Sequence, residues 1–450
     1  MRRTYLIITM LIMSLSASAQ MLSLDSCLSL AQRNNKQILV SQAQARQAAF
    51  TVKSMRANFL PDISLSGNGF WNSSSGLLLS IPQTWLPCYD ISSGTPVATG
   101  SSAYFPGMDV DYETGTVWRG SVSVTQPLYT GGKVTTAYRM AQLSEQMAQT
   151  QESLSRQEIY VEVVEAYTLL VRAQEMQRVA RQHHALLREL LQNVQSAVQH
   201  GMKLSNDQLK VQVRLNDSEL AVHRADNARR LATKNLCQVI GIEYRETIEA
   251  DTVLLQPALQ DAIEESSRPE RQLLDQQVEM AHSQARLALA DMLPQVGLQG
   301  GYGYMHGLKV GDETVLDGGS FSLTLNVSIP IFHFGGRINK VRAAEAKAEQ
   351  VELERQHLDE KMQLELSQAA DILDEASLEA SLAVRSLAQA DENLQLSRKQ
   401  YEAGMESISD LLEAQTLWQQ AYAAKVEAHC TRYLAHIKYL KAAGLLVVSD

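Results

Sequence analysis

Residues 133–200 read KVTTAYRMAQLSEQMAQTQESLSRQEIYVEVVEAYTLLVRAQEMQRVARQHHALLRELLQNVQSAVQH and contain neither glycine nor proline. They are rich in Ala, Leu, Gln and Glu, which have high helix propensity. A second interval without glycine or proline, residues 337–403, holds 67 residues against 68 in the first. Each interval predicts one helix, which at about 1.5 Å per residue would reach roughly 100 Å. Such a helix is typical of a coiled-coil assembly and has no use in a compact globular domain.

The apolar spacing of the second interval also indicates a coiled coil. Steps of three and four residues alternate over four heptads, and about half of the positions are alanine, which allows close helix packing. The positions are Leu366, Ala369, Leu373, Ala376, Ala380, Ala383, Leu387, Ala390 and Leu394. An ordinary two-stranded coiled coil is the alternative, and the strand patterns that flank the helices argue against it.

Four segments alternate apolar and polar residues with period two. Residues 321–329 place Phe, Leu, Leu, Val and Ile on one face and Ser, Thr, Asn and Ser on the other, and residues 63–71, 118–125 and 296–304 follow a similar pattern. An apolar face opposite a small, polar face is typical of a membrane β-barrel with a wet lumen. Trp71, Trp85 and Trp118 lie in this part of the chain. Their position agrees with a membrane barrel, because Trp and Tyr are enriched at membrane interfaces. A half-buried soluble sheet packed on helices is the alternative.

Four strands cannot close a barrel. Open edges cannot face lipid, because their backbone N–H and C=O groups would have no partners. Closure therefore requires several chains.

The chain repeats itself once. The Leu-Pro pair at 60–61 recurs at 293–294, an offset of 233. The Pro-x-x-Thr-Gly-Gly turn at 127–132 recurs as a Pro-to-Gly-Gly turn at 330–336, with an offset of 203 at the proline and 204 at the glycines. We expect two repeats, 20–243 and 244–450, each with a helix, two strands and a long helical hairpin whose tip lies near 201 or 404. The difference in offset predicts a long loop at 72–117 and a short one at 306–318.

The N-terminal residues predict a secretion signal over 1–19. Arg2 and Arg3 precede an apolar core at 5–13, and Ala-Ser-Ala at 17–19 is a typical cleavage site. The remaining chain carries 38 basic and 50 acidic residues and no basic stripe, which argues against a nucleic-acid partner. The four cysteines, Cys27, Cys88, Cys237 and Cys430, have no metal-type spacing. We expect isolated thiols, with a single disulfide as the alternative.

These features together resemble the TolC-like outer-membrane efflux family. The markers are the twofold repeat, the Leu-Pro pairs before strands, Gln126-Pro127-Leu128-Tyr129 with the following Gly-Gly, and the two hairpin tips. The resemblance implies an α+β membrane protein, in which each chain gives four strands to a 12-stranded trimeric transmembrane β-barrel and its helices to a coiled-coil periplasmic tunnel. Shorter helices near 24–58 and 259–291, with a linker at 244–257, would form a middle domain.

The resemblance further implies a passive duct in the outer membrane that extends into the periplasm. It would form a homotrimer in outer-membrane lipid and dock to a periplasmic adaptor protein and an inner-membrane transporter of RND or ABC type. The adaptor-docking residues would lie at the tips: Gly201, Met202, Leu204, Gly404, Met405, Ile408 and Leu411.

The periplasmic gate implied by the resemblance uses Asp410, Glu413, Tyr401 and Asp207. Asp410 and Glu413 are three residues apart, so their carboxylates share one helix face. Threefold repetition would gather six acids at one constriction and favour cations there. A family gate arginine is expected two residues after the second tip glycine, where this chain has Glu406, so the corresponding salt bridge is not expected.

We expect no enzyme, no cofactor and no metal site. The pairs His183-His184 and His429 with His436 lack cysteine or acidic partners at metal-ligand spacing. The leading function is efflux of small molecules, drugs or metals. The alternatives are the exit duct of type I protein secretion and a barrel-anchored trimeric coiled-coil adhesin. A soluble periplasmic adaptor is disfavoured by the strand pattern.

Overall fold

The computed structural model describes residues 20–71, 75–92, 94–113, 116–246, 248–251, 268–310 and 313–446. The predicted secretion signal, 1–19, lies outside the described residues, as does the second part of the predicted linker, 252–257. The chain divides into two compact units. The first comprises Met1–Ala49, Gln142–Ala281 and Lys347–Asp450, and the second comprises Phe50–Ala141 and His282–Ala346. Each half of the sequence therefore contributes to both units.

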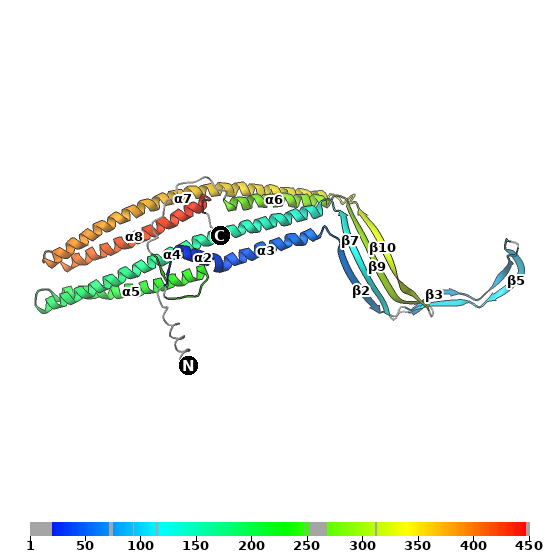
Figure 1. The fold of residues 1–450 in the computed structure, drawn as a ribbon, viewed down its shortest axis with the longest axis horizontal. Coiled ribbons are helices and arrows are strands. Elements are labelled where there is room, and N and C mark those ends of the chain that lie inside the picture. The colour runs from blue at the N-terminus through cyan, green and yellow to red at the C-terminus, as the bar shows by residue number, and fades with distance from the viewer. Residues whose placement is uncertain are drawn as a thin grey trace, which may run out of the picture. The chain divides into compact units, whose positions relative to one another are not determined.

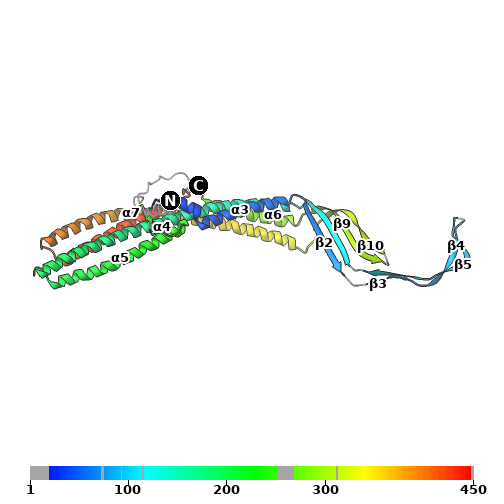
Figure 2. The same ribbon diagram turned by 60° about the horizontal axis from the view of Figure 1, so that its bottom comes forward.

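Four long helices dominate the chain. They are α4 (Lys133–Gln199), α5 (Ser205–Ile240), α7 (Gly336–Glu402) and α8 (Ile408–Ala442). The two intervals without glycine or proline are confirmed as single helices, because α4 and α7 each have 67 residues. In the first unit α4 and α5 form one antiparallel hairpin and α7 and α8 form another, and both turns lie at the same end of that unit (Figures 1 and 2).

The main core of the first unit lies where the short elements meet the long helices. Strand β1 (Gln20–Leu22) precedes helices α2 (Leu24–Asn34) and α3 (Lys36–Ala57) and pairs in parallel with β8 (Ile248–Ala250). The largest fully buried side chains of this cluster are Ile38, Leu170, Leu236, Ile240, Ile248, Val163, Val164, Val171 and Cys27. The Tyr167 hydroxyl lies 3.1 Å from Leu22 O and 3.0 Å from Asp251 O, so α4 is tied to the ends of both strands.

The second unit contains a four-stranded antiparallel array in the order β2-β7-β9-β10. Its members are β2 (Asp62–Trp71), β7 (Thr116–Tyr129), β9 (Gln295–Val310) and β10 (Glu313–Ser328). Helix α6 (Pro269–Ala290) precedes β9. Ile63 pairs with Val124 in the first hairpin, and Val296 pairs with Val327 in the second. The period-two pattern therefore forms strands as predicted.

One face of this array is apolar and exposed, and the other is polar. Phe321, Leu323 and Leu325 are all exposed along β10. On the opposite face the hydroxyls of Ser64 and Ser123 lie 2.8 Å apart, as do those of Ser66 and Ser121. Such cross-strand hydroxyl pairs satisfy polar groups on a wet surface and fix the strand register.

The prediction of a long loop at 72–117 is wrong, because the described residues of this stretch form four further strands. They are β3 (Ser75–Ile81), β4 (Thr84–Asp90), β5 (Val97–Phe105) and β6 (Met108–Glu113), paired as β3–β6 and β4–β5. The described residues of the short loop predicted at 306–318 are also strand, since β9 runs to Val310 and β10 begins at Glu313. Ser, Gly and Pro signal turns locally, but cross-strand hydrogen bonds between distant residues keep the backbone extended.

Within the described residues, no helix combines the length and the apolar character needed to cross a membrane. Cys27, Cys237 and Cys430 are buried free thiols, and Cys88 is half-buried and free. Burial raises the pKa of Cys27 to about 12, with a further contribution from Cys237. These buried thiols are therefore packing groups with little thiolate character.

Gly241 ends α5 in the left-handed conformation, with φ of 72°. A Cβ atom there would lie 2.6 Å from the Asn34 carbonyl oxygen. The Asn35 side chain donates to Val239 O at 2.8 Å, so α2 and α5 are joined at this point. Glycine is thus required both for its backbone conformation and for the close approach.

Replacing Gly241 with Ala should destabilise the protein by more than about 1 kcal/mol, because strain and a backbone clash coincide. Gly201→Ala is the matched control, since Gly201 has φ of 73° and nothing within 4 Å of the added Cβ. Urea unfolding followed by circular dichroism should give a lower midpoint for Gly241→Ala than for Gly201→Ala. Equal midpoints would contradict the role of the Asn34 contact.

Candidate functional site

The two hairpin tips are built in the same way. Gly201 and Gly404 have φ of 73° and 74°. The next residue in each tip donates its N–H five residues back, Met202 to Ala197 O at 2.8 Å and Met405 to Gln400 O at 2.9 Å. This is the Schellman pattern, in which a left-handed glycine ends a helix and its last carbonyls remain satisfied.

The five apolar side chains predicted at the tips separate into two groups. Met202, Leu204 and Met405 are 70%, 71% and 75% exposed. Ile408 and Leu411 are instead buried in a cluster that joins the two hairpins near their tips. The cluster also contains Leu187, Leu191, Val194, Val211 and Leu412. Burial leaves only the first three available to another molecule, because Ile408 and Leu411 have their partners inside the chain.

Asp410 caps its own helix. Its carboxylate accepts from the Ser407 backbone N–H at 3.1 Å and from the Ser407 hydroxyl at 2.7 Å, which completes a capping box. These hydrogen bonds, with a smaller effect of Lys210, hold the pKa of Asp410 below its ordinary value. Asp410 therefore keeps its negative charge in mildly acidic solution while it stabilises the start of α8.

Lys210 joins the two tips. Its Nζ donates to the Ser409 hydroxyl at 3.0 Å and lies 3.9 Å from the Asp207 carboxylate. Tyr401 faces Lys203, whose Nζ is 4.6 Å from the ring centroid. Burial raises the pKa of Tyr401, and the nearby charge of Asp207 adds to this effect. Asp207, Tyr401 and Asp410 thus lie around one pair of lysines, whereas Glu413 is exposed on the next turn of α8.

Glu406 stands at the position where an arginine is expected from the resemblance. Its carboxylate accepts from the hydroxyl of Ser397, which is buried, at 2.5 Å. This contact lies within the α7–α8 hairpin, and it holds the tip of the hairpin to the end of α7.

Further contacts between α4 and α8 were not predicted from the sequence. Nη1 of Arg172 lies 2.6 and 2.7 Å from the two Glu427 oxygens. Lys438 pairs with Glu165 at 2.7 Å, and the Tyr422 hydroxyl donates to Glu175 at 2.6 Å and accepts from Arg178. The partners are about 250 residues apart in sequence, so no local pattern reveals them. Each exposed ion pair contributes about 0.2–1 kcal/mol, so these polar contacts add modestly to the apolar clusters that join the two hairpins.

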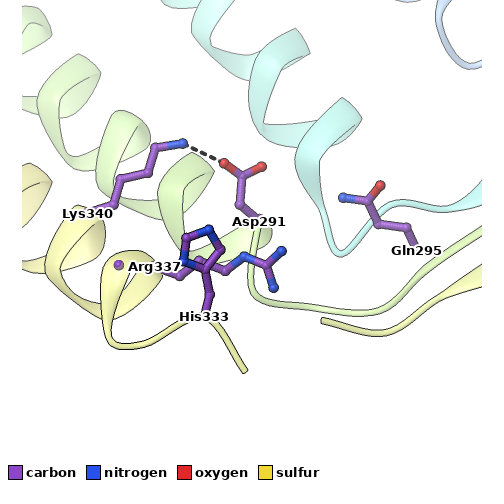
Figure 3. A pocket seen from close by; sticks show the side chains of 6 residues that line it. Asp291, Gln295, His333, Arg337 and Lys340 are labelled. Atoms are coloured by element: carbon purple, nitrogen blue, oxygen red, sulfur yellow. Dashed lines mark hydrogen bonds and ion pairs between the residues drawn. The ribbon is translucent and has the colours of Figure 1, made fainter. Parts of the chain in front are cut away.

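A second polar cluster lies in the second unit, where strands meet helices. The Asp291 carboxylate accepts from Lys133 at 3.0 Å and from Lys340 at 2.7 Å. These hydrogen bonds lower the pKa of Asp291. The carboxylate borders a pocket of about 470 Å³ that is also lined by Gln295, His333, Gly336, Arg337 and Lys340 (Figure 3).

The histidines of the two sequence pairs lie beside a hydroxyl group or in buried surroundings. His184 Nδ1 lies 2.9 Å from the Ser218 hydroxyl, and burial lowers the pKa of His183, His429 and His436. In the part of the chain that the structure describes, no three His, Cys, Asp or Glu residues are grouped as metal ligands.

Long helical hairpins joined to a short antiparallel sheet define the class of outer-membrane efflux channels. The sequence matches the family described as outer membrane efflux protein over residues 27–242 and 262–444. The chain therefore belongs to this family, which consists of channel proteins rather than enzymes.

Individual relatives agree with this assignment. The chain is 25% identical over 340 residues to the alkaline protease secretion protein AprF of Pseudomonas aeruginosa. This match covers 72% of this chain and 68% of AprF. The crystal structure of the CmeC outer membrane channel of Campylobacter jejuni is similar with a TM-score of 0.73 at 18% identity, covering 94% of this chain and 85% of CmeC. The outer membrane protein VceC of Vibrio cholerae gives 0.70 at 15% identity, with 94% and 96% covered. These two structural similarities concern the fold alone.

Proposed function

We propose that this protein is the outer-membrane channel of a tripartite efflux or export system. Three copies would close a 12-stranded barrel in the outer membrane and a helical tunnel in the periplasm. The observation that carries the proposal is the pair of free edges on an apolar sheet. Within the described residues, β2 pairs only with β7 and β10 only with β9, while the apolar face is exposed. In lipid such edges must pair with another strand, which a second copy supplies.

The internal repeat supports a specific register for the contact that we propose between copies. The repeat offset of 233 relates Ile63 to Val296, and the offset of 203 relates Val124 to Val327. Val296 pairs with Val327 just as Ile63 pairs with Val124. The two hairpins therefore share one register. In the β7–β9 pairing Ser123 faces Gly301. If the contact between copies follows the same offsets, we expect Asn326 of one copy to lie opposite Asn68 of the next.

The exposed tips support docking to a partner in the periplasm. Met202, Leu204 and Met405 offer flexible apolar surface beside the two tip glycines. Large exposed apolar side chains at a helical tip are typical of a protein contact. We propose that a periplasmic adaptor protein binds them, and that the adaptor links the duct to an energised inner-membrane transporter of RND or ABC type.

The acids near the tips support a gate. Asp207, Asp410 and Glu413 carry negative charge, and Tyr401 lies with the first two around the tip lysines. In a trimer these groups would recur three times around one axis. A ring of carboxylates attracts cations into a constriction and slows their passage when they carry more than one charge.

The cargo has two candidates. Efflux of drugs or metals is the first, in keeping with the family to which the chain belongs. Export of a protein is the second, and the similarity to a secretion protein of alkaline protease favours it. The proposed architecture is common to both.

The substitutions Asn326→Cys and Asn68→Cys should allow a disulfide to form between copies, because directly opposite residues have Cβ atoms about 4.5–5.5 Å apart. The background is Cys88→Ser, which removes the one cysteine that is not buried. The control pair is Asn326→Cys with Ser64→Cys. Ser64 lies four residues before Asn68 on the same strand, so its Cβ atom is displaced by roughly 13 Å from the expected partner position. Non-reducing gel electrophoresis should give crosslinked trimers from the first pair only. Crosslinking of the control pair alone would refute the register.

Asp410→Asn together with Glu413→Gln should weaken block of the channel by trivalent cations at least several-fold in planar bilayers. Asn retains an acceptor oxygen for Ser407, so helix capping is preserved while the charge is lost. In Glu413→Gln alone, Asp410 still supplies its negative charge. Because the pKa of Asp410 is lowered from its ordinary value of 3.8, the block should persist as the pH falls and disappear only below pH 3.8. Unchanged block in the double variant would remove these residues from the gate. Asp371→Asn with Asp374→Asn on α7 is the charge control.

Deletion of the gene in its own organism separates the two cargoes. Loss of small-molecule efflux should increase sensitivity to several toxic compounds or metals without changing the secreted proteins. Loss of a protein-export duct should remove one or a few proteins from the culture medium and leave sensitivity unchanged. Complementation with the intact gene is the control in both assays.

A further inference from the structure

The two helical hairpins of the first unit contact each other through α4 and α8. Arg172 of α4 lies 2.6 Å from Glu427 of α8, and Glu165 pairs with Lys438 at 2.7 Å. Figure 1 draws α4 and α8 between α5 and α7, which lie on the two outer flanks. The first repeat thus meets the second through α4 and keeps its α5 flank open, whereas the second repeat keeps its α7 flank open.

The repeat relates the two hairpins by one constant offset of 203 residues. Helices α4 and α7 both have 67 residues, and the same offset relates Gly201 to Gly404 and Gly241 to Gly444. Helix α7 is therefore the equivalent of α4, and α5 is the equivalent of α8. If α5 of a second copy lay on α7, the two helices could repeat the contact that α4 and α8 make within one copy.

The charges at the equivalent positions match each other, but their signs are exchanged. Arg172 corresponds to Glu375 of α7, and Glu427 corresponds to Arg224 of α5. Opposite charges therefore occupy both the contact within the copy and the contact expected between copies. Glu375 and Arg224 are both exposed in the single chain, so neither is buried by its own copy.

Two further contacts between α4 and α8 have polar equivalents on α7 and α5. The equivalents are Gln368 with Asn235 for the Glu165–Lys438 pair, and Ser381 with Glu219 for the Arg178–Tyr422 hydrogen bond. Two amides can hydrogen-bond to each other, and a hydroxyl can donate to a carboxylate. None of the three equivalent pairs brings like charges together, as a contact between copies requires.

The exchange of signs also opposes a contact between like repeats. With α5 of one copy on α4 of another in this register, Arg224 would meet Arg172. With α8 of one copy on α7 of another, Glu427 would meet Glu375. Had both repeats kept the same signs, these two arrangements would be attractive as well. A specific contact needs repulsion in the wrong arrangement as well as attraction in the right one, and this chain provides both.

The turns between strands and helices in the second unit follow the same pattern. A Cβ at Gly131 would lie 2.6 Å from the Leu293 side chain, because the turn at 127–132 closes on the end of α6. A Cβ at Gly335, in the equivalent turn, would meet only its own helix, at 3.7 Å. The equivalent of Leu293 is Leu60, which is 64% exposed, so Leu60 of the next copy is the group expected to cover the second turn.

We infer that Glu375 of one copy pairs with Arg224 of the next, and that this pair fixes α5 of the neighbouring copy as the partner of α7. The inference rests on the proposed function, because it takes the copies to form a closed ring in which each copy contacts the next through different surfaces. One exposed ion pair is weak, but this pair recurs at every contact of the ring. The occupant of the open α7 flank is thus a second copy of this chain.

Reversal of one charge should weaken the ring, and reversal of both should restore it. Glu375→Arg places two arginines at each contact and should lower the temperature at which the trimer dissociates on a semi-native gel. Arg224→Glu places two acids there and should act in the same direction. The double variant, Glu375→Arg with Arg224→Glu, should recover most of the lost stability, which damage to either helix alone would not allow.

Glu392→Arg is the matched control, because it reverses one acid of α7 at a position whose equivalent, Glu189, is exposed and has no ion pair among the described residues. Its trimer should dissociate at the same temperature as that of the unchanged protein. Circular dichroism should show the same helical content in every variant, so that a loss of folding is separated from a loss of contact. Failure of the double variant to recover would overturn the ion pair.

A crosslink tests which repeat lies on α7. In the Cys88→Ser background, Glu375→Cys with Arg224→Cys should give crosslinked trimers with a short bifunctional maleimide. Glu375→Cys with Glu427→Cys is the pair that a contact between like repeats would join, and it should give no crosslink between copies. Crosslinking between copies through this second pair alone would overturn the inference.

The proposed function is tested separately from this contact. Trimers that conduct and crosslink through Asn326→Cys with Asn68→Cys, but not through Glu375→Cys with Arg224→Cys, would refute the helical contact alone. Monomers under all conditions would refute the helical contact and the proposed duct together.

Discussion

Every structural feature of this chain depends on how its backbone hydrogen bonds are satisfied. In the long helices each N–H finds its acceptor within the same segment, so α4 and α7 extend over 67 residues without help from neighbours. In the sheet each strand needs partners on both sides, and β2 and β10 each have one in the described chain. The helical hydrogen bonds are made within one copy, whereas the open edges of the sheet are the physical reason for the assembly that we propose.

The helical hairpins differ in character along their length. Near α2 and α3 the first unit has a dense apolar core, with Ile38, Leu170 and Leu236 fully buried. Nearer the tips the hairpins share a smaller cluster around Leu187 and Val194. Ion pairs such as Arg172–Glu427 join α4 to α8 at the exposed side of the core, where Arg172 follows the buried Val171. Exposed ion pairs of this kind add little to the stability that the two apolar clusters provide.

Charge differs between the hairpin tips and the segments that flank the strands. The chain is acidic overall, with acids at the tips, yet it is basic where the strands begin and end. The Asp410 carboxylate completes the capping box of α8, and the same hydrogen bonds lower its pKa and favour the charged form that the proposed gate requires. In the second unit, Asp291 pairs with Lys133 and Lys340, while Arg337 has no ion pair among the described residues.

The sequence by itself determined the elements whose signals are local. The absence of glycine and proline predicted α4 and α7, alternation predicted β2, β7, β9 and β10, and Gly201 and Gly404 predicted the turns. Composition failed at 72–117, where pairing over long range makes strands of a Ser- and Gly-rich stretch. Only the tertiary structure decided that Ile408 and Leu411 are buried while Met202 and Met405 are exposed. It also brought Arg172 to Glu427 and Lys133 to Asp291. Periodicity fixes the face of an element, but burial and ion pairing depend on which distant segment covers that face.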